Sequence, residues 1–344
     1  MRAPALFIAV ALSACAARQP PPAAPRACPD DDAVAPVPIA LAGIDARRRR
    51  HEGSRYAEVS AMAWHGDDLW LVPQYPDRYA RDGREGALLS IPRARIEAYL
   101  DGRERGPIEP ARVPFAVGSV ATVQGYEGVE AMVVEGDRVW VTIEVRESED
   151  RASSILVSGR VGAEGVRLDD RRVALPPPVD LPNTAYEALL AVPDGLVAIF
   201  ESNGSTQRTE PTALVVAREL GAPPAAIPFP RTEYRITEVT PLDARGRFWA
   251  ANYFFPGDHF LAPGEVRAVD TVEQLVEFRW AADGITRTAR RPVVLRRGSH
   301  PRNWEGLARL PGRGVLAVTD EWPDTLLALI PTERARRRRG DVRR

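Results

Sequence analysis

Residues 126–146, YEGVEAMVVEGDRVWVTIEVR, constrain the fold more than any other part of the chain. Two apolar, β-branched runs flank Glu135-Gly136-Asp137, which is typical of a tight turn between antiparallel strands. One glutamate, Glu130, opens the first predicted strand, and another, Glu144, closes the second. The stretch therefore predicts a β-hairpin with a carboxylate near the open end of each strand.

This hairpin pattern recurs along the chain in altered form. Each copy has an apolar strand, a turn rich in Gly, Asp or Pro, and a second apolar strand, at a spacing of roughly 60 residues. Self-similarity at a fixed period is typical of propellers and solenoids, whose repeats bury their faces only against neighbouring repeats. The copies are residues 56–75, 126–146, 186–203, 234–253 and 303–321.

Each hairpin is followed by material for further strands. After the fifth hairpin only 325–330 remains, whereas 37–44, VPIALAGI, is spare at the other end. Since a propeller commonly closes its ring by letting one terminus complete the last blade, we predict an all-β propeller of five four-stranded blades closed by this N-terminal strand. The segment 92–103, PRARIEAYLDGR, is predicted to be helical. Further strands are predicted at 86–91, 111–117, 153–158, 165–175, 212–218, 225–229, 274–280 and 285–295.

Two other all-β architectures compete with five blades. A six-bladed propeller would hide its extra blade in the interval 75–125 or 253–302. A β-sandwich is the second alternative, but it does not predict a hairpin signature that recurs at this spacing. The repeat therefore favours a propeller.

The N-terminus is predicted to be a processing signal. One arginine precedes an apolar run over residues 3–12, which is too short to span a membrane. The run ends in LSAC, which resembles the lipobox of bacterial lipoproteins, where cleavage precedes an acylated cysteine, here Cys15. The resemblance implies export and, with alanine at position 16, anchoring to the outer membrane, facing the periplasm or the cell surface. An ordinary signal peptide with an incidental cysteine is the alternative.

These signals divide the chain into four parts. The formal net charge of -1 gives no overall field that would attract nucleic acid. The sequence does not indicate an oligomeric state. The parts are a lipoprotein signal peptide (1–14), the acylated cysteine with a Pro/Ala-rich tether (15–36), the propeller (37–331) and an arginine-rich disordered tail (332–344).

The repeat also predicts where its acidic residues lie. In an antiparallel hairpin, the residue that opens the first strand and the residue that closes the second lie at the same end. Because the first strand of each propeller blade lines the axis, we expect the opening residues to ring one mouth of the channel. The opening residues are Ser60, Glu130, Glu187, Glu238 and Glu305, and the closing residues are Gln74, Glu144, Glu201, Asn252 and Asp320.

Crowded carboxylates repel one another unless something neutralises them. A divalent cation, calcium first, would do so with oxygen ligands, and arginine salt bridges would do so without any metal. In the second case the carboxylates only hold the ring together. In the cation hypothesis, the metal ligands are Glu130, Glu187, Glu238, Glu305 and Asn252; the substrate contacts are Glu144, Glu201, Asp320 and Arg302; and His259 and His300 transfer protons.

The copies EGVEAMVVEGDRVWVTIEVR and NWEGLARLPGRGVLAVTDE resemble blades of the bacterial phytase-like esterase family and, more loosely, gluconolactonase-type propellers. The helical insert in SIPRARIEAYLDG is also similar to the former. The resemblance implies a secreted propeller that hydrolyses ester or phosphoester bonds, with divalent cations in the channel. The first copy departs from the pattern, because Ser60 and Gln74 replace acids, and this weakens the case for a full metal cage.

Two functions of different class follow. The first is an envelope-anchored, cation-dependent hydrolase of a small-molecule ester or phosphoester. The second is a non-catalytic propeller that binds an envelope polymer or a protein partner. The sequence contains no G-x-S-x-G elbow, P-loop or H-E-x-x-H motif, so neither a serine nucleophile nor nucleotide chemistry is indicated.

The lipobox generates a first prediction. Cys15→Ser removes the acylated sulfur, so the protein should leave the membrane fraction and accumulate as a soluble or unprocessed species. Cys28→Ser, which changes the other cysteine of the chain, is the control and should fractionate like the parent. Immunoblots of membrane and soluble fractions measure the difference. Unchanged membrane association of Cys15→Ser would disprove the anchor.

Overall fold

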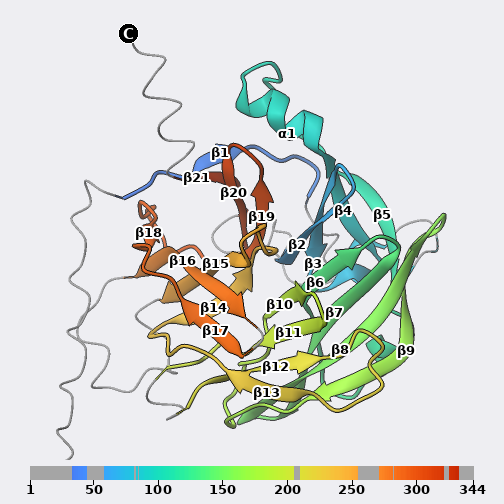
Figure 1. Cartoon of the computed structure of the whole chain (residues 1–344). Coiled ribbons are helices and arrows are strands. Elements are labelled where there is room, and N and C mark those ends of the chain that lie inside the picture. The colour runs from blue at the N-terminus through green and yellow to red at the C-terminus, as the bar shows by residue number, and fades with distance from the viewer. Residues whose placement is uncertain are drawn as a thin grey trace, which may run out of the picture.

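The computed structural model describes residues 33–44, 58–80, 83, 85–204, 210–254, 271–281, 283–320 and 325–332. Within these residues the chain is an all-β propeller, as predicted (Figure 1). Cys15, the predicted signal peptide and the arginine-rich tail from residue 333 lie outside the described residues. No helix in the described part of the chain is long and apolar enough to cross a membrane.

The first two hairpins and the strands that follow them join into one eight-stranded sheet. The outer strands of its two halves pair in parallel, with Phe115 opposite Val166 and Ala116 opposite Arg167. One half contains β2 (Val59–His65), β3 (Asp68–Pro73), β4 (Ala87–Pro92) and β5 (Ala111–Ala116), and the other contains β6 (Tyr126–Glu135), β7 (Arg138–Ser148), β8 (Arg151–Gly162) and β9 (Gly165–Leu175).

The remaining strands form three smaller sheets. The third unit contains β10 (Ala188–Val192), β11 (Gly195–Ile199), β12 (Thr212–Val216) and β13 (Ala225–Pro228). The fourth contains β14 (Arg235–Val239), β15 (Arg247–Phe254), β16 (Val272–Ala281) and β17 (Gly284–Arg287), with β18 (Val293–Val294) paired to β16. The fifth contains β19 (Trp304–Leu310), β20 (Gly314–Thr319), β21 (Leu327–Pro331) and β1 (Val37–Ile39).

The innermost strands of these units contact one another in a closed ring. Strand β2 contacts β6, β6 contacts β10, β10 contacts β14, β14 contacts β19, and β19 contacts β2. These five inner strands divide the described residues into five units. We refer to the units as blades 1 to 5 in the order of their inner strands.

The core lies between the blades rather than at one centre. One apolar cluster joins Trp70 and Leu88 of blade 1 to Val141 of blade 2, and another joins Trp249 of blade 4 to Trp304 of blade 5. Further clusters occupy the other boundaries. A strand that is packed on both faces is apolar at nearly every position, and this explains why these strands do not alternate between polar and apolar residues.

The helical insert was predicted correctly. Helix α1 (Arg93–Leu100) follows β4 directly, and short 3-10 turns occupy Pro76–Tyr79 and Gly118–Thr122. Ile96 is the buried residue of α1 and joins the cluster between blades 5 and 1. The insert therefore packs against the outside of the propeller and leaves the ring of inner strands intact.

The N-terminal segment closes the ring, as the spare strand predicted. In Figure 1, β1, drawn in blue, lies beside β21, drawn in red, and Val37 pairs with Leu329 while Ile39 pairs with Leu327. The strand ends earlier than predicted because the backbone leaves blade 5 after Ile39. Ala40 and Ala42 instead exchange hydrogen bonds of 2.8 and 2.9 Å with Ile108, which precedes β5 in blade 1.

The closure generates a second prediction. Ile39 is 1% exposed, so Ile39→Ala should leave a cavity and lower the free energy of unfolding by about 2 to 5 kcal/mol. Ala40→Ser, at the adjacent exposed position, is the control and should change stability by less than about 0.5 kcal/mol. Urea unfolding measures both. Equal stability of the two variants would show that β1 is not needed for closure.

Candidate functional site

A β-bulge recurs in the inner strands. At each bulge, one side chain departs from the regular alternation between the two faces of the sheet. The pairing register shifts between Val59 and Ala61, between Val129 and Ala131, and between Trp304 and Gly306. A bulged residue has no direct partner on the neighbouring strand, so its side chain is re-aimed. The bulged residues are Ser60, Glu130 and Glu305, which are the opening residues predicted for these copies.

The fourth copy corrects the predicted alignment by one residue. Here the register shifts between Ile236 and Glu238, so the bulged residue is Thr237 and not Glu238. Thr237 also behaves like its counterpart Ser60, because each hydroxyl donates to a backbone carbonyl in the inner strand of the next blade. The Thr237 Oγ1 to Trp304 O distance is 2.6 Å, and the Ser60 Oγ to Val129 O distance is 2.5 Å.

Glu238 therefore occupies the position after the bulge, where the other bulged strands have small residues. Those residues are Ala61, Ala131 and Gly306. At Gly306 an added Cβ would lie 2.5 Å from a Val318 methyl group, so the position is tightly enclosed. Glu238 is 3% exposed, and its Oε1 accepts a 2.7 Å hydrogen bond from the backbone N–H of Val239.

Carboxylates from three blades lie close enough for their charges to raise one another's pKa. Burial raises the pKa of Glu130 well above its usual range, and the charges of Glu144 and Glu187 raise it further. Burial likewise raises the pKa of Glu305, together with the charges of Asp320, Glu187 and Glu130. These side chains come from blades 2, 3 and 5, so the ring brings together residues that are far apart in sequence. We call Glu130, Glu144, Glu187, Glu305 and Asp320 the acidic cluster.

The pKa of Glu144 lies near neutrality. Burial, with the neighbouring charges of Glu187 and Glu127, raises the pKa of Glu144 to about 7. Arg146 and Arg235 oppose this change. The side chain of Glu144 is therefore close to half-ionised at neutral pH.

Arg235 is the cation of the site, and the sequence analysis did not identify it. Its guanidinium Nη2 lies 3.6 Å from Glu187 Oε1, and its Nε pairs with Oε1 of Glu201. The Glu201 side chain is fully buried. Once the alignment is corrected, Arg235 stands two residues before the bulge, where other copies have Gly128 and Asn303. Blade 4 thus supplies a positive charge where its bulged residue is neutral.

Hydrogen bonds from neighbouring amides orient two members of the acidic cluster. Gln74 Nε2 donates to Glu130 Oε1 over 2.9 Å and crosses from blade 1 to blade 2. The side-chain amide of Asn303 donates to Glu305 Oε1 within blade 5. Gln74 was predicted to close the first hairpin at this mouth, and its amide supplies the donor that an acid could not.

The remaining predicted site residues have other surroundings. Asn252 Nδ2 donates to the carbonyls of Tyr234 and Arg235, and its Oδ1 accepts from Gln274, so its amide is held within blade 4. Arg302 pairs with Glu273 over 2.9 Å and covers Trp304. His300 is exposed in the connection before β19, and His259 lies outside the described residues.

The predicted cation cage was tested against this geometry. Among the described residues no three His, Cys, Asp or Glu side chains form a group that could hold a metal ion. Asn252, which was predicted as a ligand, already has its amide bonded to protein groups. The metal-ligand set stays a prediction, and the counter-charge that the structure shows beside Glu187 and Glu201 is Arg235.

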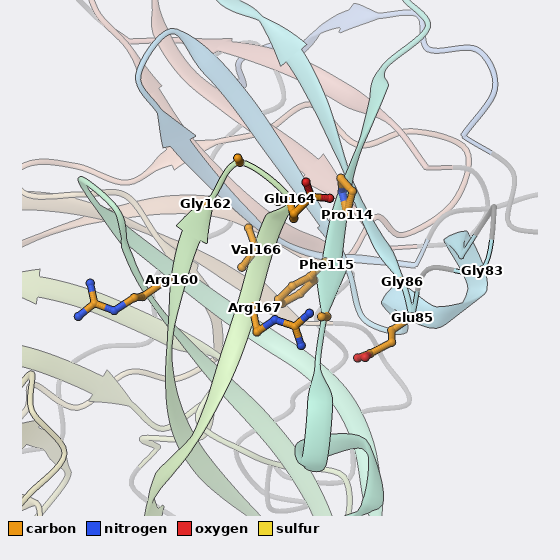
Figure 2. Close-up of a pocket in the computed structure, with 13 residues that line it drawn as sticks. Gly83, Glu85, Gly86, Pro114, Phe115, Arg160, Gly162, Glu164, Val166 and Arg167 are labelled. Carbon is orange, nitrogen blue, oxygen red and sulfur yellow. The ribbon is translucent and has the colours of Figure 1, made fainter.

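A separate hollow of about 530 Å³ lies where the first two blades join (Figure 2). It is formed at the parallel β5–β9 pairing, with Phe115 and Val166 in its wall and Arg160, Arg167 and Glu164 around it. None of the predicted site residues lines this hollow.

Comparison with known proteins gives similarity in fold. No protein-family model matches the chain, and no curated protein matches it. A glucose dehydrogenase structure is 13% identical and has a TM-score of 0.46, covering 82% of this chain and 99% of its own. The apo soluble aldose sugar dehydrogenase of Escherichia coli is 11% identical, with a TM-score of 0.46 and coverage of 86% and 99%. A GH43 endo-arabinanase of Bacillus licheniformis is 10% identical, with a TM-score of 0.44 and coverage of 81% and 95%.

Burial of Glu238 generates a third prediction. Its pKa is raised well above the usual range by burial and by Glu187, so the folded state holds the proton more tightly than the unfolded chain. Stability must then fall as pH rises above the unfolded pKa of about 4.3. Glu238→Gln removes the titrating group, so it should be more stable than the parent at pH 8, with the gain shrinking toward pH 4.

Urea unfolding at both pH values checks this sign. Glu149→Gln is the control, because Glu149 is an exposed glutamate in the β7–β8 turn and should leave stability unchanged at either pH. A Glu238→Gln variant that is less stable than the parent at pH 8 would contradict the assignment of Glu238 as a destabilising buried acid.

Proposed function

We propose that this chain is a propeller hydrolase of ester bonds, held at the cell envelope by an acylated Cys15, with the acidic cluster as its active centre. The observation that carries the proposal is the pair Glu130 and Glu144 on one hairpin, where burial and neighbouring charges raise both pKa values. Carboxyl groups with raised pKa values that share one site are suited to act as an acid and a base together.

The two roles follow from the protonation states. Glu144, close to half-ionised near pH 7, accepts a proton from a water molecule as that water attacks the ester carbonyl carbon. Glu130, whose pKa burial raises well above its usual range, acts as the acid and donates its proton to the departing alkoxide, so that an acid and an alcohol are released. The hydrogen bond from Gln74 orients the Glu130 carboxyl group.

The charge of the cluster selects the substrate class. Several carboxylates face one arginine, Arg235, whose guanidinium already pairs with Glu187 and Glu201. A phosphoester anion would be repelled by this excess of negative charge, whereas a neutral carboxylic ester would not. We therefore place carboxylic esters first, and phosphoesters only with a divalent cation such as calcium. Because the described residues form no metal cage, no step is assigned to a cation.

A non-catalytic propeller that binds an envelope component is the second candidate. The observation in its favour is that Glu130 and Glu305 each accept a hydrogen bond from a neighbouring amide. Such bonds are also found where polar groups only hold a structure together. In this case the acidic mouth would bind its partner without changing it.

The acid–base pair generates a fourth prediction. Glu144→Gln keeps the size of the side chain but cannot accept the proton, so kcat/KM should fall by about 10² to 10⁴ on p-nitrophenyl esters. In the parent, activity should rise as pH increases through about 7, because the base form of Glu144 is required. The variant should lack this limb. Initial rates over pH 5 to 9 measure both effects.

Controls separate this mechanism from its alternatives. Glu149→Gln should retain full activity, because that glutamate is exposed in the β7–β8 turn and is not a member of the acidic cluster. Activity should survive chelation of divalent ions for carboxylic esters. Loss of activity on chelation would show that the reaction depends on a cation. If the parent hydrolyses none of a broad panel of esters, the non-catalytic binding function is favoured over the enzyme.

A further inference from the structure

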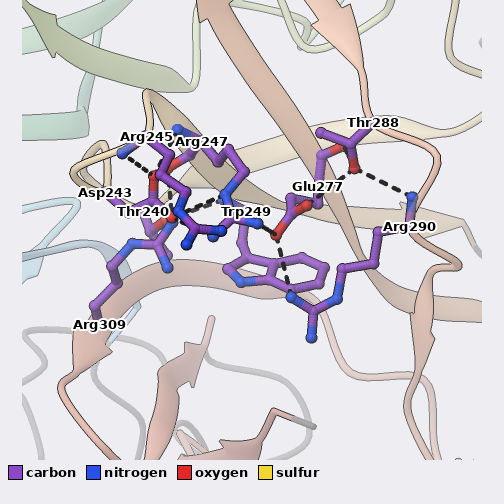
Figure 3. A network of polar contacts seen from close by, with 9 residues as sticks. All are labelled: Thr240, Asp243, Arg245, Arg247, Trp249, Glu277, Thr288, Arg290 and Arg309. Atoms are coloured by element: carbon purple, nitrogen blue, oxygen red, sulfur yellow. Dashed lines mark hydrogen bonds and ion pairs between the residues drawn. The ribbon is translucent and has the colours of Figure 1, made fainter. Parts of the chain in front are cut away.

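A second charged cluster lies at the other end of the inner hairpin of blade 4, around the turn between β14 and β15 (Figure 3). It has no member in common with the acidic cluster and is independent of the proposed hydrolase. Arg309 enters it from β19 of blade 5. We call it the basic cluster, and its members are Asp243, Arg245, Arg247, Trp249, Glu277, Thr288, Arg290 and Arg309.

Two arginines neutralise the two acids of the basic cluster. Asp243 Oδ2 pairs with Arg247 over 2.8 Å, and Asp243 Oδ1 accepts the backbone N–H of Arg245 and of Arg247. Glu277, whose side chain is 5% exposed, pairs with Arg290 over 3.2 Å and accepts a 3.0 Å bond from the Thr288 hydroxyl. These pairs account for both negative charges.

Arg309 has no such partner. Its Nε donates to the carbonyl of Pro241 over 3.0 Å, and its Nη2 donates to the carbonyl of Arg247 over 2.8 Å. Within the described residues it forms no ion pair, and its Nη1 forms no hydrogen bond. Burial lowers the pKa of Arg309, and the charges of Arg247 and Arg290 act in the same direction, against those of Asp243 and Glu277. A half-buried guanidinium is thus held in place by carbonyl groups while its charge stays uncompensated.

Arg245 adds a second unpaired cation. It lies exposed in the same turn, and its guanidinium forms no ion pair with any residue that the structure describes. The basic cluster therefore contains four arginines against two acids. Figure 3 places Arg309 and Arg290 on opposite sides of Trp249, and Arg290 stacks on that ring at 4.6 Å.

From this geometry we propose that the basic cluster binds a phosphate-type oxyanion at the boundary between blades 4 and 5, with Arg309 as its principal ligand. A guanidinium offers N–H groups in a fixed fork that matches the oxygens of phosphate. Two carbonyls already fix the orientation of Arg309, so little side-chain freedom is lost on binding. An anion would also compensate the excess charge that the two acids leave.

Phosphate chemistry can come from a free anion or from a phospholipid headgroup. The first test uses the full chain with inorganic phosphate, compared with chloride at equal ionic strength. Because a ligand that binds only the folded state stabilises it, phosphate should raise the melting temperature. Isothermal titration then gives the affinity, which Arg309→Gln should weaken by about tenfold to a hundredfold.

Two further variants keep the test decisive. Arg309 also bridges blades 4 and 5, so Arg245→Gln, at an exposed position without such contacts, provides a second loss of charge that leaves the fold intact. It should weaken phosphate binding severalfold. Arg172→Gln removes the same charge from an exposed position on β9 in blade 2 and should bind phosphate like the parent. Equal weakening in all three variants would overturn the site.

Vesicles distinguish the two sources. Binding to phosphatidic acid vesicles but not to phosphatidylcholine vesicles, reduced in Arg309→Gln and unchanged in Arg172→Gln, would identify the ligand as a lipid headgroup. Binding of inorganic phosphate without vesicle binding would identify a free anion. If neither phosphate nor these vesicles bind more strongly to the parent than to Arg309→Gln, the proposal is wrong.

Discussion

Closure of the ring is the constraint on which the rest of this molecule depends. Every blade has an apolar face on each side, so each of its two boundaries must be covered by a neighbour. A short N-terminal segment completes the circle, because β1 pairs with β21 of blade 5 and Ala40 and Ala42 bond to Ile108 beside blade 1. Residues at the two ends of the chain therefore stabilise the same core cluster.

The ring also builds the acidic cluster. Backbone bonds link two inner strands to the preceding blade, from Val129 N to Gln74 O and from Ile236 N to Glu201 O, at 2.9 Å each. The bulges in these strands then carry one polar side chain each. In blades 2 and 5 that side chain is a carboxylate, and burial together with like charges raises its pKa. Raised pKa values of this kind cost stability once the pH exceeds the pKa of the unfolded chain, and they are typical of functional sites.

Blade 4 differs from the others at both of its ends. At the mouth its bulged residue is Thr237, and Arg235 provides the counter-charge for Glu187 and Glu201. At the opposite end its turn carries the basic cluster, where Arg309 from blade 5 stays without an acid. Both ends of this blade thus carry positive charge. At the mouth the arginine is paired with acids, whereas at the turn the arginines outnumber the acids.

The sequence by itself determined the strands, the turns, the helix and the closing segment. Alternation between apolar runs and turn residues is a local pattern, and it predicted α1, the hairpins and the pairing of the N-terminal strand with blade 5. It also singled out Glu130 and Glu305, which lie at bulges inside β6 and β19 and not at the first residue of either strand. Only the tertiary structure decided the contacts between blades. The one-residue shift at Thr237, the pairing of Arg235 with Glu201, the internal bonds of Asn252 and the isolation of Arg309 depend on bulges and on neighbours distant in sequence. A linear repeat cannot encode these contacts, because each one is set by how two separate blades meet around the axis.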